Sequence, residues 1–161
     1  MHKPEWLTVA EQNSGVAEIP GPRHSNVISR WLSKLGAWWS DDETPWCGVF
    51  AAYCMQEAGQ PIPKAYYRAK EWETYGSRLQ RDRLSPGAIL VFERKGGGHV
   101  GFYVGESQTH YYVLGGNQSN EVNVSKIAKY RLTASRWPKG VPVMGKPVAM
   151  HTGATETKNE A

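Results

Sequence analysis

The segment 44–54, TPWCGVFAAYC, places a cysteine close to the point where a helix is expected to begin. Thr44 suits the N-cap and Pro45 the first helical position, so Cys47 is expected at about the third helical position. Unpaired backbone N–H groups and the helix dipole favour a negative charge in this first turn. A thiolate is the form of cysteine that attacks a carbonyl carbon. The segment therefore predicts a nucleophile, provided that a histidine lies beside it.

One of the five histidines has a position that suits this partnership. His99 opens an expected strand directly after three glycines, where backbone can pass close to another group and leave the ring accessible. A histidine beside a cysteine can act as its general base. The other four are expected in tails, a loop and a turn, and they are His2, His24, His110 and His151.

An asparagine is expected to orient the His99 ring. If the strands 99–105 and 111–116 form a hairpin with Gly105 opposite Tyr111, His99 lies opposite Asn117. An amide oxygen there would accept from one ring nitrogen and fix the tautomer. The register is an assumption, and a slip of one residue would put the side chains on opposite faces. The competing interpretation is a turn residue, but the hairpin favours a triad of Cys47, His99 and Asn117.

The two cysteines are not expected to form a disulfide. Cys47 and Cys54 are seven residues apart, which on one helix separates them by ~10 Å of rise, whereas a disulfide needs Cα atoms within ~7 Å. Cys54 shares an apolar helix face with Phe50 and Ala51 and is expected to be a small buried hydrophobe.

The order of the elements predicts an α+β fold with helices first and strands second. Helices are expected over 6–10, 26–35, 45–58 and 65–75, from apolar residues at helical spacing and from Gly and Pro at their ends. Strands are expected over 88–92, 99–105 and 111–116, with weaker ones over 122–124 and 130–135. We expect N-terminal helices packed on an antiparallel sheet of about five strands, a single catalytic domain over 1–150, and a disordered tail over 151–161.

Composition limits the possible partners. The chain has 161 residues, a net charge of +4 and a pI near 9.1, which permits attraction to polyanions. No nucleic-acid-binding motif is present, and no apolar stretch approaches the ~20 residues of a membrane span. The N-terminus lacks the apolar region of a signal peptide. We therefore expect a monomer, made in the cytoplasm, that binds neither nucleic acid nor the membrane interior.

Four blocks of the sequence resemble the CHAP and NlpC-like cysteine peptidases. They are TPWCGVFAAYC, SPGAILVF, GHVGFYVG and LGGNQSN, in the family's order and spread over residues 5–140. The likeness is greatest to a compact subfamily of phages and prophages of Gram-negative bacteria. It implies a papain-like fold, a peptidoglycan amidase or endopeptidase, and the roles of nucleophile, base and orienting residue for Cys47, His99 and Asn117. No cofactor is implied.

The chain departs from the family pattern in two places. Many CHAP enzymes have an acidic residue two positions before the asparagine, where this chain has Gly115. Some bind calcium through an acidic loop before the cysteine, but the acids at 41–43 lack the spacing of a calcium loop. No metal is expected. Trp46, Gly98 and Gln118 are the candidates for lining the substrate cleft.

Several functions remain open at this stage. The resemblance favours a phage endolysin that a holin releases to the periplasm, where it degrades the cell wall. A secreted antibacterial effector with an immunity protein is one alternative, and an inactive wall-binding module of the same fold is another. A zinc hydrolase using Cys47, His99 and His110 is less favoured, because the sequence contains no two-ligand cluster.

Overall fold

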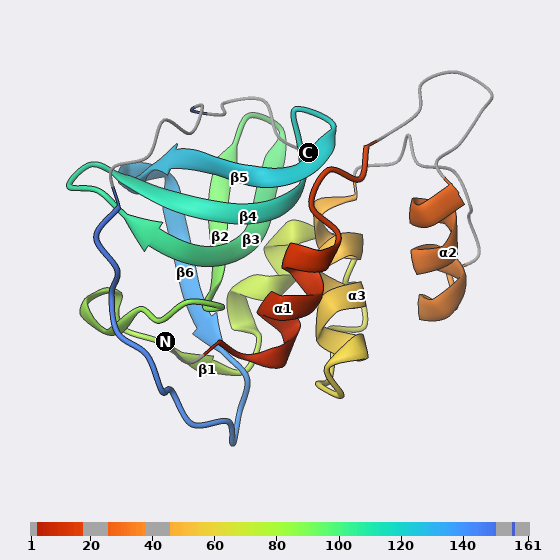
Figure 1. Cartoon of the computed structure of the whole chain (residues 1–161), viewed down its shortest axis with the longest axis horizontal. Coiled ribbons are helices and arrows are strands. Elements are labelled where there is room, and N and C mark those ends of the chain that lie inside the picture. Colours follow the sequence, from red (N-terminus) through yellow and green to blue (C-terminus); the bar gives the residue numbers. More distant parts are fainter. Residues whose placement is uncertain (1–2, 18–25, 38–45, 151–155, 157–161) are drawn as a thin grey trace.

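Helices and an antiparallel sheet occupy two sides of the molecule, as the computed structural model shows in Figure 1. The structure describes residues 3–17, 26–37, 46–150 and 156. The α-helices are α1 (Glu5–Gln12), α2 (Asn26–Leu35) and α3 (Cys47–Glu57), and the 3-10 helices are η1 (Ala69–Thr74), η2 (Arg81–Arg83) and η3 (Lys129–Arg131). The α+β prediction is confirmed.

Six strands form one sheet in the order β1-β6-β2-β3-β4-β5, with every neighbouring pair antiparallel. They are β1 (Ser77–Arg78), β2 (Ile89–Arg94), β3 (Gly97–Glu106), β4 (His110–Gln118), β5 (Glu121–Ala128) and β6 (Leu132–Trp137). All five predicted strands are found. The short edge strand β1 has no hydrophobic pattern in the sequence, and it was not predicted.

The predicted helices agree with the structure to different degrees. The helix over 26–35 is found with the same bounds, whereas the one predicted from 45 begins at Cys47. Thr44 and Pro45, the predicted cap and first residue, lie outside the described residues. The segment predicted as a helix over 65–75 forms only the 3-10 helix η1. The turn between β2 and β3 needs Lys95 and Gly96 alone, so the following glycines belong to β3.

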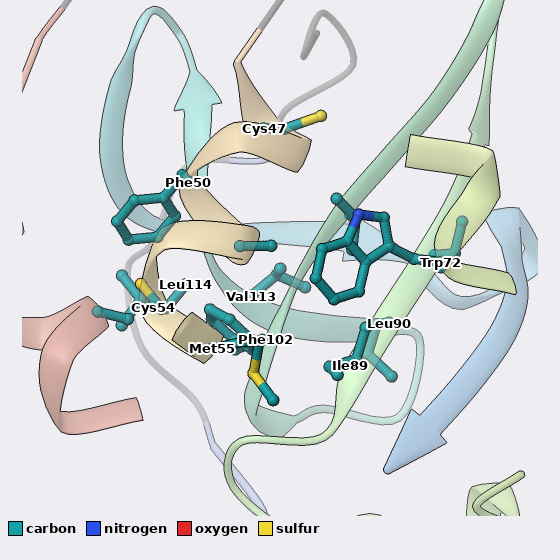
Figure 2. Packing of buried hydrophobic residues seen from close by; sticks show 14 of the residues in the cluster. Cys47, Phe50, Cys54, Met55, Trp72, Ile89, Leu90, Phe102, Val113 and Leu114 are labelled. Atoms are coloured by element: carbon teal, nitrogen blue, oxygen red, sulfur yellow. The ribbon is translucent and has the colours of Figure 1, made fainter. Parts of the chain in front are cut away.

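Helix α3 lies at the centre of the core. Trp31 of α2 packs on its outer side, with ring centroids 5.2 Å from Phe50 and 5.4 Å from Tyr53. On its inner side α3 contacts β3 and β4, and Figure 2 shows Phe50 and Met55 near residues of these strands. Because the helix is covered on both sides, its two ends are fixed relative to the sheet.

Both cysteines of α3 are thiols in the structure, as predicted. Cys54 is fully buried, and burial raises the pKa of its thiol well above the usual range. It is therefore a core residue with little tendency to react.

The segment after β6 returns along the far end of β3. Glu106 donates its backbone N–H to Val148 O at 2.7 Å and accepts from Met150 N at 2.8 Å. Of the expected tail, only Glu156 is described, and its carboxylate lies 3.1 Å from His110 Nε2. No helix among the described residues is both long and apolar enough to span a membrane.

Candidate active site

Cys47 is the first residue of α3, with Trp46 as its N-cap. Phe50 N donates to Trp46 O at 2.9 Å, which is the first hydrogen bond of the helix. The N–H groups at this end have no acceptor within the helix, so the cysteine lies in the field that favours an anion. Figure 2 shows its sulfur at the end of the helix, pointing away from the apolar side chains of the later turns. Cys47 as a whole residue is 3% exposed.

Two glycines allow backbone to approach this end of α3. A Cβ on Gly116 of β4 would lie 2.7 Å from Phe50 Cβ and 2.9 Å from the Trp46 ring, so only glycine lets the strand pass so close. A Cβ on Gly48 would overlap the backbone oxygen of Tyr66. The residue types next to the cysteine therefore hold β4 and the 66–67 segment against the first turn of the helix.

His99 lies on β3, which is in contact with α3. Its ring is fully buried and packs beside Phe92 of β2, with centroids 6.5 Å apart. Its Nε2 atom lies 2.9 Å from Gln118 Oε1. An amide oxygen only accepts hydrogen bonds, so the ring donates from Nε2. A neutral imidazole that donates from Nε2 carries its basic lone pair on Nδ1.

The orientation of the Gln118 amide follows from its other contacts. Its Nε2 atom donates to Val113 O at 3.1 Å and to Asn123 O at 2.8 Å. Backbone carbonyl oxygens cannot donate, so the amide nitrogen must face them and the amide oxygen must face His99. The tautomer of His99 is therefore determined by the sheet around Gln118.

Asn123 of β5 completes this network. Its Oδ1 accepts from Gln118 Nε2 at 3.0 Å and from Ser125 Oγ at 2.8 Å. Its Nδ2 donates to Gln118 O at 3.0 Å and to Glu121 Oε1 at 3.1 Å. A half-buried network whose members have hydrogen-bond partners restricts the motion of the Gln118 amide.

Asn117, the predicted orienting residue, makes no contact of this kind. Its side chain is buried, and its Oδ1 atom has no hydrogen-bond partner in the described part of the chain. Its backbone is left-handed, with φ of 57°. Gly115 pairs with Asn123 and Gln118 with Glu121, so Gly116 and Asn117 together oppose one residue of β5. This bulge brings Gln118 to His99 in the place expected for Asn117.

Gly115 provides the space that Gln118 fills. A Cβ at this position would lie 2.8 Å from Gln118 Oε1 and 3.3 Å from His99 Nε2. This chain has glycine and not an acidic residue at position 115. The amide that contacts His99 comes instead from Gln118, three residues further along the chain.

The other predicted cleft residues differ in position. Trp46 is buried in the core, 6.0 Å from Trp31 between ring centroids, and presents no face to a substrate. Gly98 is next to His99, and a Cβ there would lie 3.0 Å from Lys70 Cε. Lys70, which sequence reasoning missed, forms ion pairs with Glu93 and with Glu73. It borders the histidine side of the site.

The described residues contain no group of three or more His, Cys, Asp or Glu side chains that could hold a metal ion. His110 lies at the opposite end of β4 from Gln118 and pairs with Glu156. The acids at 41–43 lie outside the described residues.

A cysteine that opens a helix, packed on an antiparallel sheet that carries a histidine and an amide, defines a papain-like α+β protein. Residues 39–117 match the family model of the CHAP domain, and the chain contains a domain of this family. The match includes Cys47, His99 and Asn117 and ends one residue before Gln118. A comparison with curated proteins found no match. The family assignment indicates a peptidoglycan hydrolase of the amidase or peptidase kind.

Proposed function

We propose that the protein cleaves an amide bond of peptidoglycan, with Cys47 as nucleophile, His99 as general base and acid, and Gln118 as the residue that orients the imidazole. The observation that carries this proposal is the 2.9 Å hydrogen bond between His99 Nε2 and Gln118 Oε1. This hydrogen bond leaves Nδ1 as the basic nitrogen of the His99 ring. His99 lies on β3, which packs against α3, the helix that begins at Cys47.

The reaction proceeds through a thioester. His99 Nδ1 takes the thiol proton as Cys47 Sγ attacks the amide carbonyl carbon, and the backbone N–H of Cys47 donates to the oxyanion. The imidazolium then gives this proton to the leaving nitrogen, and the C–N bond breaks. Water, deprotonated by His99, attacks the thioester, and the thiol returns with the carboxylic acid product. Gln118 keeps its hydrogen bond to Nε2 throughout.

The biological setting belongs to the same proposal. We infer a phage endolysin that acts on the cell wall from the periplasm, on the strength of the sequence resemblance. A secreted effector amidase uses the same chemistry, and its distinguishing sign is an immunity protein that binds and inhibits the enzyme. The bond is either the N-acetylmuramoyl–L-alanine amide or one in the stem peptide or cross-bridge.

The test is digestion of purified murein sacculi by wild-type protein, Cys47→Ala and the matched control Cys54→Ala. We expect Cys54→Ala to digest and Cys47→Ala to be inactive, because the reacting sulfur is absent. Mass spectrometry of the released muropeptides identifies the bond. Digestion by Cys47→Ala would contradict the thiol mechanism. Wild-type protein that sediments with sacculi without digesting them would show a binding module instead.

A further inference from the structure

A cavity lies at the sheet edge formed by β1 and β6, beside η2. It has a volume of about 600 Å³ and shares no residue with the Cys47, His99 and Gln118 site. Its lining includes three arginines, Arg78, Arg81 and Arg136, and two acids, Glu73 and Asp82. The three cations come from three different elements, so the fold brings them together.

Two of these arginines face each other across the strands. Arg78 of β1 is directly paired with Arg136 of β6. Like charges in opposed positions of a sheet destabilise it unless another group neutralises them. The positive charge of Arg78, after burial, lowers the pKa of the Arg136 guanidinium, which is the sign of this repulsion.

The acids of the cavity do not form contact ion pairs with these cations among the described residues, although they reduce the net charge of the lining to +1. Glu73 forms its ion pair with Lys70, at 3.6 Å. Among the described residues, neither Glu73 nor Asp82 forms an ion pair with Arg78, Arg81 or Arg136. Three arginines against two acids leave the lining with one net positive charge, and the guanidinium groups are not engaged by the acids.

Two of the guanidinium groups are already held in place. Arg136 donates from Nε to Tyr75 O at 2.6 Å and from Nη2 to Gly76 O at 3.2 Å. Arg81 donates from Nη2 to Leu132 O at 3.3 Å. Each retains other N–H donors for a ligand. A ligand that binds here therefore needs to immobilise only Arg78, and fewer rotamers are lost on binding.

We propose that this cavity binds a phosphate group. A single arginine fork satisfies both oxygens of a carboxylate, whereas phosphate offers more oxygens and up to two negative charges, which suits several convergent guanidinium groups. The phosphate is either free in solution or the headgroup of an anionic lipid. This site is independent of the hydrolytic reaction.

The test uses the full chain carrying Cys47→Ala, so that binding is measured without catalysis. Inorganic phosphate is titrated calorimetrically at pH 7, with glutarate as a dicarboxylate of similar charge. We expect phosphate to bind at least tenfold more tightly than glutarate. Arg78→Gln is expected to weaken phosphate binding at least tenfold. Arg83→Gln, an exposed arginine of η2 outside the lining, is the matched control and is expected to bind normally.

Thermal unfolding provides a second measurement that does not depend on calorimetric heats. In phosphate-free buffer Arg78→Gln is expected to be at least as stable as the parent, because a like-charge pair is removed. Added phosphate should then raise the midpoint of the parent and of Arg83→Gln but not of Arg78→Gln. Equal responses of all three proteins, or equal binding of glutarate and phosphate, would overturn the proposal.

Vesicles distinguish the two sources of phosphate. Arg78-dependent sedimentation with phosphatidylglycerol vesicles, and not with phosphatidylcholine vesicles, would support a lipid headgroup as the ligand. Binding of inorganic phosphate without vesicle binding would support free phosphate. Failure of both would overturn the site while leaving murein digestion by the wild-type enzyme unaffected.

Discussion

His99 Nε2 donates a hydrogen bond to Gln118 Oε1 at 2.9 Å, and the same Gln118 amide donates to the backbone oxygens of Val113 and Asn123. The relationship has one direction only, because carbonyl oxygens cannot donate. It connects the sheet to the tautomer of the neutral imidazole. The ring is fixed with its proton on Nε2, and the nitrogen proposed to act on Cys47 is the basic one.

Replacement of Gln118 tests this relationship directly. Gln118→Met keeps the length of the side chain but removes the acceptor, and we expect kcat on murein to fall roughly 100-fold. The His99 ring should then populate both neutral tautomers, which ¹⁵N NMR of the imidazole distinguishes. A loss of activity with the wild-type tautomer retained would mean that Gln118 acts only through packing.

Asn117→Gly is the matched variant for this experiment. Asn117 has a left-handed backbone, which glycine adopts without strain, and its Oδ1 has no partner among the described residues. We expect this variant to retain most of the activity. If it were as inactive as Gln118→Met, the asparagine predicted from the sequence would be the orienting residue after all.

The register assumed for the β3–β4 hairpin explains why the sequence predicted Asn117, the residue next to Gln118, as the partner of His99. The assumed register holds where Phe102 pairs with Leu114, but it fails near the turn, where Gly105 pairs with Tyr112 and not with Tyr111. Beyond Gly115, β4 also has a bulge in its pairing with β5, which adds a residue that a regular period of two cannot foresee. The sequence signal for this bulge is the run of two glycines followed by an asparagine, since these residues tolerate left-handed backbone.

The fold class could be read from local patterns, whereas the supporting network of the site could not. Apolar periodicity located the helix over 26–35 and the strands around His99, because each pattern depends on neighbours in the sequence. Asn123 and Gln118 meet through pairing of β4 with β5, and the role of Gly115 depends on a side chain three residues away. Such contacts depend on register, which composition does not determine.

Gly115→Ala is expected to disturb the site without unfolding the protein. The added Cβ would lie 2.8 Å from Gln118 Oε1, so the amide must move away from His99. We expect kcat to fall roughly tenfold to 100-fold, as for loss of a supporting contact. Gly97→Ala on β3 is the matched control, because a Cβ there meets nothing within 4 Å. Equal activity of both variants and the wild type in a murein turbidity assay would contradict the role of Gly115.

Asn123 is expected to act as a positioning residue through Gln118. Asn123→Ala removes one acceptor from the Gln118 amide but leaves the two backbone acceptors, so we expect less than a tenfold fall in kcat, with KM unchanged. The stability cost is about 1 kcal/mol for each side-chain hydrogen bond that is lost. Ser125→Ala, which removes only the bond to Asn123 Oδ1, serves as the control. A larger fall in kcat for Ser125→Ala than for Asn123→Ala would contradict the positioning role of Asn123.

The two thiols are expected to differ in their reaction with iodoacetamide. Cys54 is fully buried and its pKa is raised by burial, so little thiolate forms. Cys47 lies at the helix end with a little exposure, and it should be modified first, at neutral pH, with loss of murein digestion in parallel. Peptide mapping follows each site. Modification of Cys54 in the folded protein at the rate of Cys47 would contradict this assignment.

Alkaline pH should destabilise the fold through its buried tyrosines. Burial raises the pKa of Tyr75 from 10.0 to about 12, and its hydroxyl donates to Pro61 O at 2.6 Å. The unfolded chain releases this proton near pH 10, so the native state holds it more tightly. Stability is therefore full below pH 10 and falls between pH 10 and 12, by at most about 1.4 kcal/mol per pH unit for each such group.

Urea unfolding at pH 9, 10 and 11 measures how steeply the free energy of unfolding falls with pH. Tyr75→Phe should reduce this slope, whereas Tyr130→Phe, at a side chain 87% exposed, should not. Equal slopes for Tyr75→Phe and the wild type would show that Tyr75 ionises alike in both states.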